Sequence, residues 1–424
     1  MGQRPGIQYC GETAGRDQGP PRRPGRVLPL AGAAAGKRTM TSRSPLTIYL
    51  DNAATSHPKP ECVYQAVVHA MRHIGASPGR AGHRRSLEAS RLLFQVREAI
   101  ATLLSVPDSS RIIFTHSATE ALNLALQGVL LAGDHVVTTS MEHNSLLRPL
   151  YQLRRRGVEL TIVEAAGDGL VDPDAVRRAF RPTTRMLALG HVSNVCGAIQ
   201  PVARLATIAR EAGALFLLDA AQSAGSIPID AAGLGVDLLA APGHKGLLGP
   251  QGTGFLFVAE GVEIRPLLAG GTGSNSSSEE QPHILPEGFE AGTHNLPGIA
   301  GLLAGVEFVL ARGVDVIGRR EREHVAEVAR RLAPLPGMAI HGPSFPANRS
   351  GLLSFTLAGM DASSLAFMLD QRFDIAVRAG LHCAPLAHRS LGTYPAGTVR
   401  VSPGWFTSND EIAIFCDAVV KCIP

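Results

Sequence analysis

The stretch "RIIFTHSATEALNLALQGVLLAGDHVVTT" (residues 111–139) places one helical pattern between two short apolar runs. The alternation continues as far as Ala259, with a further helix expected after Pro201. Alternating strands and helices are typical of a mainly parallel sheet that helices cover on both faces. The sequence therefore predicts an α/β fold for this part of the chain. The later apolar runs are "ELTIV" (159–163), "RMLAL" (185–189), "ALFLLD" (214–219), "VDLLAA" (236–241) and "GFLFV" (254–258).

The remainder of the chain predicts a second, smaller unit. Helical patterns dominate from Leu296 to Leu332. The run "GLLSFTL" (351–357) then precedes a helical pattern at 363–371, which together indicate a smaller α+β unit. Between the two parts, "GGTGSNSSSEEQ" (270–281) predicts a polar loop that is exposed and mobile.

The composition is that of a soluble globular protein, with 45% hydrophobic and 18% charged residues. A chain of 424 residues can bury a large core and is long enough for two domains. The excess positive charge lies in residues 1–44, and the nearly balanced charge elsewhere argues against a nucleic-acid-binding protein. Because residues 1–44 are rich in proline, glycine and arginine, we expect a disordered tail, with Met40 as a candidate for the true start.

The cysteines show no C-x-x-C pair and no metal-ligand spacing. In a chain of this length, such a pattern favours reduced thiols, a cytoplasmic location and no metal site. No uninterrupted apolar run approaches the roughly 20 residues that a membrane span requires, so no membrane partner is expected. The six cysteines are Cys10, Cys62, Cys196, Cys383, Cys416 and Cys422.

Polar side chains follow several of the expected strands, where ligands bind in open parallel sheets. These residues are Thr119, His143, Asn194 and Asp219. Considered singly, each has an ordinary explanation. Thr119 or Ser117 could cap a helix, and Asp219 could hold a turn. His143 and Asn194 could be ordinary loop or core residues.

Lys245 lies in the glycine-rich stretch "PGHKGLLGPQGTG" (242–254). A phosphate-binding P-loop needs Ser or Thr directly after the lysine, but Gly246 follows. Together with the strand-end residues, Lys245 suggests a ligand with a phosphate, a protonated ring nitrogen and an aldehyde. The phosphate would bind at the helix N-terminus near Ser117, Asp219 would pair with the ring nitrogen, and Lys245 would form an imine. That ligand is pyridoxal 5'-phosphate, and the glycines would leave room for it.

Eight motifs extend this pattern from Tyr49 to the C-terminus. They are "YLDNAATS" (49–56), "SATEALN" (117–123), "MEHNS" (141–145), "HVSNVCGAIQP" (191–201), "LDAAQSAG" (218–225), "GHKGLLGPQGTG" (243–254), "FEAGTHN" (289–295) and "RAGLHCAP" (378–385). With these motifs the chain resembles the class V aminotransferase-fold enzymes, and among them the short-loop cysteine desulfurases and selenocysteine lyases. The resemblance implies the type I fold of pyridoxal-phosphate enzymes. Its large domain (66–298) would hold a mainly parallel seven-stranded sheet, and 45–65 with 299–424 would form the smaller domain.

The resemblance also implies roles toward the cofactor. Lys245 corresponds to the lysine that forms the Schiff base, and Asp219 to the partner of the ring nitrogen. His143 corresponds to the histidine that stacks on the ring and moves protons. Asn194 and Gln222 correspond to the amides that orient the cofactor. The implied phosphate ligands are Thr119, the backbone amide of Ala118, His244 and, from the neighbouring subunit of a homodimer, Thr293.

Other matching residues are implied to contact the substrate. Arg400 corresponds to the arginine that binds the substrate carboxylate, for which bidentate pairing is suited. Asn52, His83 and Arg378 lie in active-site segments. Cys383 alone is more simply explained as a small buried apolar residue. The resemblance instead implies the nucleophile that accepts sulfur as a persulfide, and nearby cations would raise the fraction of its thiolate form.

Three positions depart from the pattern of the relatives. Pro242 stands where many relatives have a hydroxyl residue for the phosphate, and Ala118 offers a backbone amide alone. Leu381 stands where better-known short-loop members have a second histidine. The first two positions leave the details of the phosphate site open, and Leu381 leaves the physiological substrate and the sulfur acceptor open.

The leading hypothesis is a homodimeric, pyridoxal-phosphate-dependent cysteine desulfurase that converts L-cysteine to L-alanine, leaving a persulfide on Cys383 for a sulfur-acceptor protein. One alternative is selenocysteine lyase activity on L-selenocysteine, and another is a different class V aminotransferase or lyase. A catalytically silent scaffold or sulfur-relay protein is a further alternative. The intact set of Lys245, Asp219 and His143 argues against that last alternative.

Overall fold

The computed structural model describes residues 47–79, 82–273, 278–346 and 348–423. The predicted disordered tail (1–44) and the candidate start at Met40 lie outside these residues. Residues 274–277 of the predicted loop 270–281 also lie outside them, and the described residues of that loop are exposed or half-buried.

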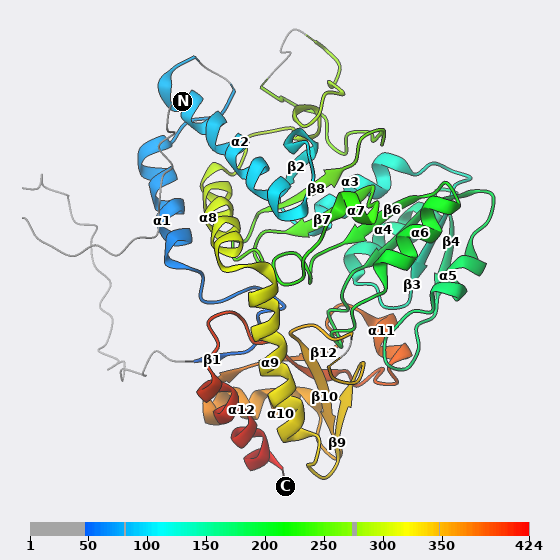
Figure 1. Ribbon diagram of the computed structural model, residues 1–424, viewed down its shortest axis with the longest axis vertical. Coiled ribbons are helices and arrows are strands. Elements are labelled where there is room, and N and C mark those ends of the chain that lie inside the picture. Colours follow the sequence, from blue (N-terminus) through cyan, green and yellow to red (C-terminus); the bar gives the residue numbers. More distant parts are fainter. Residues whose placement is uncertain (1–46, 80–81, 274–277, 347, 424) are drawn as a thin grey trace, which may run out of the picture. The chain divides into compact units, whose positions relative to one another are not determined.

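The strand–helix alternation forms a seven-stranded sheet in the order β2-β8-β7-β6-β5-β3-β4 (Figure 1). Strands β7, β6, β5, β3 and β4 are parallel to one another, whereas β8 is antiparallel to both β2 and β7. The predicted mainly parallel sheet of seven strands is therefore confirmed. The strands are β2 (Ile112–Thr115), β3 (His135–Thr139), β4 (Glu159–Val163), β5 (Thr184–Gly190), β6 (Leu215–Asp219), β7 (Leu238–Pro242) and β8 (Gly254–Val258).

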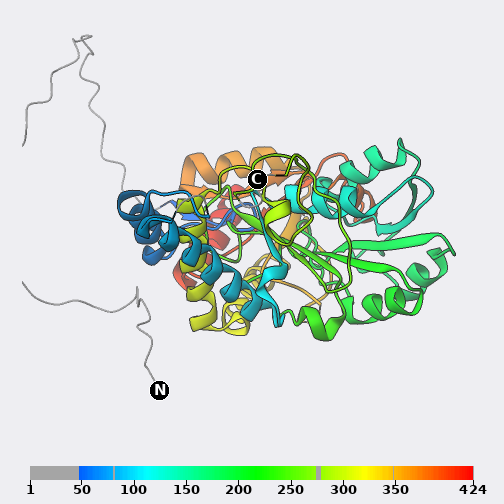
Figure 2. The same cartoon turned by 90° about the horizontal axis from the view of Figure 1, so that it is seen from above.

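Helices cover both faces of this sheet, because successive side chains of a strand point in opposite directions (Figure 2). In β6, Phe216 and Leu218 belong to one hydrophobic cluster, and Leu217 belongs to another. The first cluster includes side chains of α1, α2, α6 and α8, and the second those of α3 and α4. The helices of this part are α1 (Glu61–His69), α2 (Arg84–Leu104), α3 (Ala118–Val129), α4 (Asn144–Arg154), α5 (Pro173–Ala179), α6 (Val202–Glu211), α7 (Ala231–Leu234) and α8 (Leu296–Arg312), with short helical turns at Ala70–Ile74, Ser109–Arg111 and Glu287–Phe289.

A second, antiparallel sheet of four strands has the order β12-β13-β10-β9 and its own hydrophobic core. Ile48 and Leu50 from the start of the described chain pack into this core. The predicted smaller α+β unit thus has its own sheet, while the domain boundaries at 66 and 298 stay predictions. The elements are β1 (Ile48–Tyr49), α9 (Val314–Leu332), β9 (Met338–His341), β10 (Leu353–Leu357), α10 (Ala362–Phe373), β11 (Ile375–Ala376), β12 (Arg378–Gly380), α11 (Pro385–Ser390), β13 (Thr398–Val401) and α12 (Asn409–Cys422).

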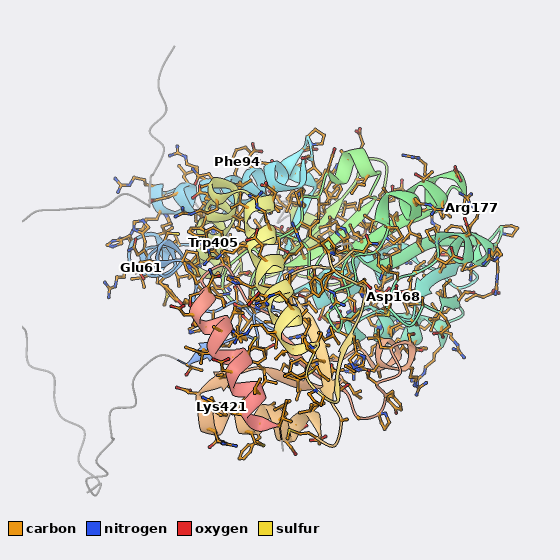
Figure 3. All side chains as sticks on the ribbon, turned by 60° about the horizontal axis from the view of Figure 1, so that its bottom comes forward. Glu61, Phe94, Asp168, Arg177, Trp405 and Lys421 are labelled. Atoms are coloured by element: carbon orange, nitrogen blue, oxygen red, sulfur yellow. The ribbon has the colours of Figure 1, made fainter. Side chains whose placement is uncertain are left out.

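The loop after β13 packs against α8 and α9 through Trp405 (Figure 3). The ring centroids of Trp405 and Phe308 are 6.4 Å apart, and the Arg320 guanidinium lies 5.5 Å from the Trp405 ring centroid. The contact with Phe308 joins the smaller sheet to α8, which packs beside the large sheet. Among the described helices, none is long and apolar enough to cross a membrane.

Candidate active site

The carboxyl ends of β3, β5, β6 and β7 open into a cleft with a volume of about 190 Å³. Such a cleft is where an open parallel sheet binds its ligand. The structure thus brings together residues that lie more than 100 positions apart in the sequence, although their roles toward a ligand stay predictions. The predicted site residues that line the cleft are Ala118, Thr119, His143, Asn194, Asp219, Gln222, His244 and Lys245.

Asp219 ends β6 and is buried, with 7% of its surface exposed. Its Oδ1 accepts a hydrogen bond of 2.9 Å from the Ala221 amide. Burial raises the pKa of this carboxyl group, and the Ala221 amide and the charge of Lys245 partly oppose that rise. A buried carboxylate bonded to a backbone amide is suited to a ligand that brings a cationic N–H group.

Lys245 lies in the loop after β7, where close packing requires glycines. A Cβ atom on Gly243 would come within 2.1 Å of Thr253 Oγ1, and one on Gly246 within 2.4 Å of the Ala224 carbonyl oxygen. The expectation that these glycines also leave room for a cofactor stays a prediction. A side chain at either position would collide with the protein itself.

Burial also sets the charge of the Lys245 amine. It lowers the pKa of Lys245 to about 8, against the opposing charge of Asp219, and the charges of Arg400 and Arg378 lower it further. An amine with this pKa is partly neutral near physiological pH. Only the neutral amine can attack an aldehyde, so the environment suits the predicted covalent role.

The N-termini of α3 and α4 both face the cleft. Ser117 caps α3 by accepting a hydrogen bond of 3.2 Å from the Glu120 amide, so the helix-cap explanation is correct for Ser117. Thr119 follows in the first turn, where free backbone amides and the helix dipole favour an anion. His143 caps α4, with Nδ1 accepting from the Ser145 amide at 3.0 Å. Burial, followed by the charge of Lys245, lowers the pKa of His143 to about 4, so its ring is neutral.

Sequence reasoning missed Glu142, which also lines the cleft and is 2% exposed. Its carboxyl group accepts hydrogen bonds from Thr139 Oγ1 and, at 2.7 Å, from the Gly190 amide. Burial raises the pKa of Glu142 to about 8, and the nearby Asp219 adds to the rise. Glu142 is therefore largely protonated at neutral pH. Its position within "MEHNS", after a buried strand, was the signal that could have identified it.

Two arginines from the smaller sheet lie near Lys245, since the charges of both lower its pKa. They are Arg378 of β12 and Arg400 of β13, which are neighbours because they are paired in register. Arg400 is 1% exposed. Its Nη2 forms an ion pair of 2.7 Å with Asp51, and its Nη1 donates to the Asn194 carbonyl at 2.9 Å. Sequence reasoning missed Asp51 and selected its neighbour Asn52. Asn52 Nδ2 donates to the Ser402 carbonyl at 3.0 Å, so it anchors the loop after β13.

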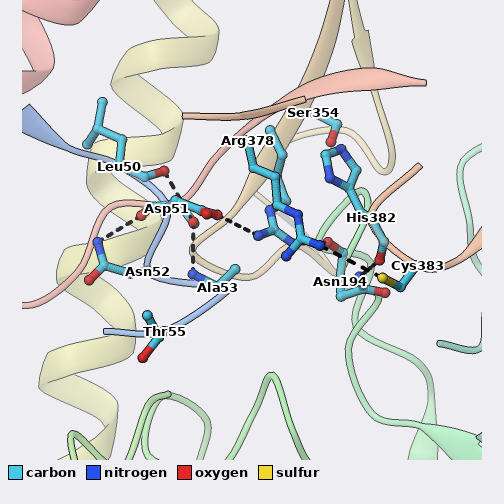
Figure 4. A network of polar contacts seen from close by, with 12 residues as sticks. Leu50, Asp51, Asn52, Ala53, Thr55, Asn194, Ser354, Arg378, His382 and Cys383 are labelled. Carbon is cyan, nitrogen blue, oxygen red and sulfur yellow. Dashed lines mark hydrogen bonds and ion pairs between the residues drawn. The ribbon is translucent and has the colours of Figure 1, made fainter. Parts of the chain in front are cut away.

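Cys383 is exposed, so the explanation as a buried apolar residue is wrong. Arg378 Nη2 lies 3.8 Å from its sulfur (Figure 4). Two hydrogen bonds hold the loop to the cleft: Asn194 Nδ2 donates to the His382 carbonyl at 2.7 Å, and the Asn144 amide donates to the Cys383 carbonyl at 2.8 Å. His382 and Cys383 have φ angles of 48° and 59°, a left-handed conformation that is costly for such residues.

The remaining two predicted site residues lie outside the cleft. Thr293 is exposed and lines a separate pocket with Glu120 and His294. His83 is exposed and caps α2, with Nδ1 accepting from the Ser86 amide at 3.2 Å. Within one subunit, the described chain does not bring either residue to Lys245.

The chain is similar to proteins that are already known. The family "Aminotransferase class-V" matches residues 48–415. A protein of Methanothermobacter thermautotrophicus named probable cysteine desulfurase is 37% identical over 374 residues, which cover 87% of this chain and 92% of the relative. Another of that name from Halalkalibacterium halodurans is 36% identical over 390 residues, which cover 89% and 92% of the two chains.

Two solved structures have the same fold. The apo cysteine desulfurase of Thermococcus onnurineus NA1 has a TM-score of 0.83 and 33% identity, with 89% of this chain and 94% of that chain covered. The cysteine desulfurase CsdA of Escherichia coli, solved in an S-sulfonic acid form, has a TM-score of 0.80 and 30% identity. That match covers 88% of this chain and 94% of the other.

Proposed function

The chain belongs to the aminotransferase class-V family, and we propose that it is a pyridoxal-phosphate-dependent cysteine desulfurase. It would convert L-cysteine to L-alanine and leave a persulfide on Cys383. The observation that carries this proposal is the position of Cys383. Its exposed thiol lies 3.8 Å from the Arg378 guanidinium, on a loop that is hydrogen-bonded to the Lys245 cleft.

Enzymes of this family generally use pyridoxal phosphate, and the residues of the cleft fit that cofactor. Lys245 would hold it covalently, and Asp219 would pair with its ring nitrogen. The N-terminus of α3 near Thr119 would bind its phosphate, and the neutral His143 would lie against its ring. When bound, the cofactor supplies an electron sink that makes the substrate Cα–H and Cβ–S bonds easier to break.

Arg400 would bind the carboxylate of L-cysteine. Asp51 and the Asn194 carbonyl already orient its guanidinium from two sides, which reduces the entropy lost when substrate binds. Once the Lys245 amine is no longer bound to the cofactor, it would accept the proton from the substrate Cα. Its pKa of about 8 suits a group that must both take and return a proton near neutral pH.

Cys383 would attack the substrate sulfur as a thiolate. The S–S bond forms as the substrate Cβ–S bond breaks, and the electron pair of the broken bond goes to the alanyl fragment, whose Cβ then takes a proton. L-cysteine and the enzyme thiol thus become L-alanine and an enzyme persulfide, and no external oxidant or reductant is needed. The Arg378 guanidinium would stabilise the anionic sulfur in both states.

Three further features belong to the proposal. A homodimer is supported by the exposed Thr293, which lies outside the cleft of its own subunit. A sulfur-acceptor protein is supported by the exposure of Cys383. A cytoplasmic location is supported by the free thiols of Cys196, Cys383, Cys416 and Cys422.

The test is a Cys383→Ser variant assayed with L-cysteine and L-selenocysteine. Alanine release from L-cysteine should fall by at least about 100-fold, because the nucleophile is lost. L-selenocysteine turnover should be spared in part, since selenium leaves more easily. Wild-type protein given L-cysteine without an acceptor should carry one extra sulfur atom on Cys383, measured by peptide mass spectrometry.

Cys422→Ala is the matched control, because this buried thiol lies at the end of α12 and does not line the cleft. It should retain normal alanine release. Normal desulfuration by Cys383→Ser, together with no persulfide on Cys383, would exclude the proposed mechanism and favour another lyase or an aminotransferase.

A further inference from the structure

The carbonyl group of His244, directly before Lys245 in the chain, is the meeting point of four hydrogen-bond donors. The donors are the Ser56 amide at 3.0 Å, Ser56 Oγ at 3.1 Å, Thr55 Oγ1 at 3.2 Å and Lys59 Nζ at 2.9 Å. A carbonyl oxygen has two lone pairs, so two donors would be enough to satisfy it. The two additional donors restrain the position of this carbonyl further. The contacts tie residues 55–59 to the lysine loop across more than 180 positions of sequence.

Lys59 differs from the other donors because it brings a charge. Its Nζ also donates to Ser56 Oγ at 2.6 Å, so its partners in the described part of the chain are hydroxyl and carbonyl oxygens rather than carboxylates. Burial lowers the pKa of Lys59 to about 8, which reflects the cost of holding an ammonium group there. A charge-assisted hydrogen bond is about twice as strong as a neutral one, so the ammonium holds this carbonyl more firmly than a neutral donor would.

The lysine loop has other internal hydrogen bonds, but among the described residues none of them uses the His244 carbonyl. The Leu248 amide donates to the Lys245 carbonyl at 2.9 Å, and the Gly249 amide donates to the Gly243 carbonyl at 2.8 Å. The peptide that enters Lys245 is held by residues 55–59 instead. Removing the charge of Lys59 therefore weakens the anchor of this peptide and removes no donor or acceptor of the other two bonds.

We propose that Lys59 is a positioning residue for Lys245, because its ammonium group fixes the peptide between His244 and Lys245. The inference rests on the proposed function, in which the Lys245 amine must leave the cofactor and return to it in every turnover. During that interval the cofactor no longer restrains the side chain. The backbone anchor then keeps the amine within reach of the cleft.

The experiment adds pyridoxal phosphate to cofactor-free protein and follows its attachment to Lys245 by absorbance. Borohydride reduction and peptide mass spectrometry then verify the attachment point. Lys59→Met should slow attachment by at least about tenfold, the loss expected for one hydrogen bond to a charged group. The attachment rate of Lys59→Arg should be close to that of the wild type, and the rate of Lys59→Gln should lie between those of the Arg and Met variants. Lys421→Met removes another lysine, near the end of α12, and should have no effect.

Hydrogen exchange gives a readout without cofactor or substrate. In cofactor-free Lys59→Met, peptides covering 243–249 should exchange faster than in wild type, whereas peptides of α12 should not change. If the Met variant does not fold, the attachment rates of the wild type, the Arg variant and the Gln variant still test the proposal, because the Gln variant alone should be slowed.

Equal attachment rates in wild type and the Lys59 variants would overturn the inference while leaving the proposed function intact. A wild-type protein that attaches no pyridoxal phosphate at Lys245 would overturn the proposed function and this inference with it. Equal slowing in the Arg and Met variants, with a similar fall in Tm, would show a general structural role and would also overturn the inference.

Discussion

At the scale of single residues, burial sets the charges of the two groups that carry the proposed chemistry. Burial raises the pKa of Asp219 and lowers the pKa of Lys245, so each charged state is costly in the cleft. A cationic ring nitrogen beside Asp219 would restore the favourable pairing. The proposed cofactor would bring that positive charge to Asp219 at the end of β6 and an aldehyde to Lys245 in the loop after β7.

Asp219→Asn tests this pairing, because it keeps the shape of the side chain and removes its charge. Turnover of L-cysteine should fall by about 100-fold or more, while cofactor occupancy should fall much less, since other residues also hold the cofactor. Occupancy is measured by absorbance and turnover by alanine release. Asp237→Asn is the control, because Asp237 accepts a hydrogen bond from the Phe216 amide near the opposite end of the same strands. Near wild-type turnover in fully loaded Asp219→Asn would contradict the pairing.

At the scale of elements, one buried ion pair joins α2 to the edge of the large sheet. Arg97 of α2 pairs with Glu290 at 2.6 Å, and Glu290 also accepts from the Phe114 amide of β2 at 2.6 Å and contacts His294 Nε2 at 2.7 Å. Glu290 and His294 flank Thr293 in "FEAGTHN". The ion pair therefore positions the loop that carries the residue proposed to serve the neighbouring subunit.

Glu290→Gln should lower the free energy of unfolding by about 3–5 kcal/mol, because it leaves the buried Arg97 without its counter-ion. Burial alone would raise the pKa of Glu290, but the hydrogen bond from His294 and the charge of Arg97 outweigh it and lower the pKa. This group therefore stabilises the fold above its unfolded pKa of about 4.3, and the contribution is lost as the pH falls through the lower folded value.

Urea unfolding of wild type and Glu290→Gln at pH 7 and at low pH measures both effects, and their difference should shrink at low pH. Glu327→Gln is the matched control, because it breaks the surface ion pair with Arg330 and should cost less than about 1 kcal/mol. Equal effects of the two substitutions at pH 7 would show that the buried pair has no special role.

At the scale of the whole molecule, one proposed phosphate ligand lies outside the cleft that it would serve. Thr293 is exposed and lines a different pocket from Lys245 in the same subunit. A homodimer in which each loop 289–295 reaches the partner's cleft would complete both sites. In such a dimer, the oligomeric state would be tied to cofactor binding.

Sedimentation should show a dimer. The Thr293→Ala substitution should weaken the affinity for the cofactor and leave the dimer intact. Mixed dimers of Thr293→Ala and Lys245→Ala subunits test whether Thr293 acts across the interface. Such a dimer has one site with both native residues if Thr293 serves the partner, so wild-type affinity should return in that site. If Thr293 serves its own subunit, mixing restores nothing, and a fully active monomer would remove the dimer proposal altogether.

The sequence alone determined the large sheet, because alternating strands and helices are a local property of the chain. The ordered motifs also determined most residues of the cleft, since strand ends in a parallel sheet converge at one edge. Tertiary structure decided the contacts between distant segments: Asp51 with Arg400, and Lys59 with the His244 carbonyl. It also decided the protonation of Glu142 and the exposure of Cys383. The burial of a group depends on which distant residues the folded chain packs around it, and a local sequence pattern does not predict those residues.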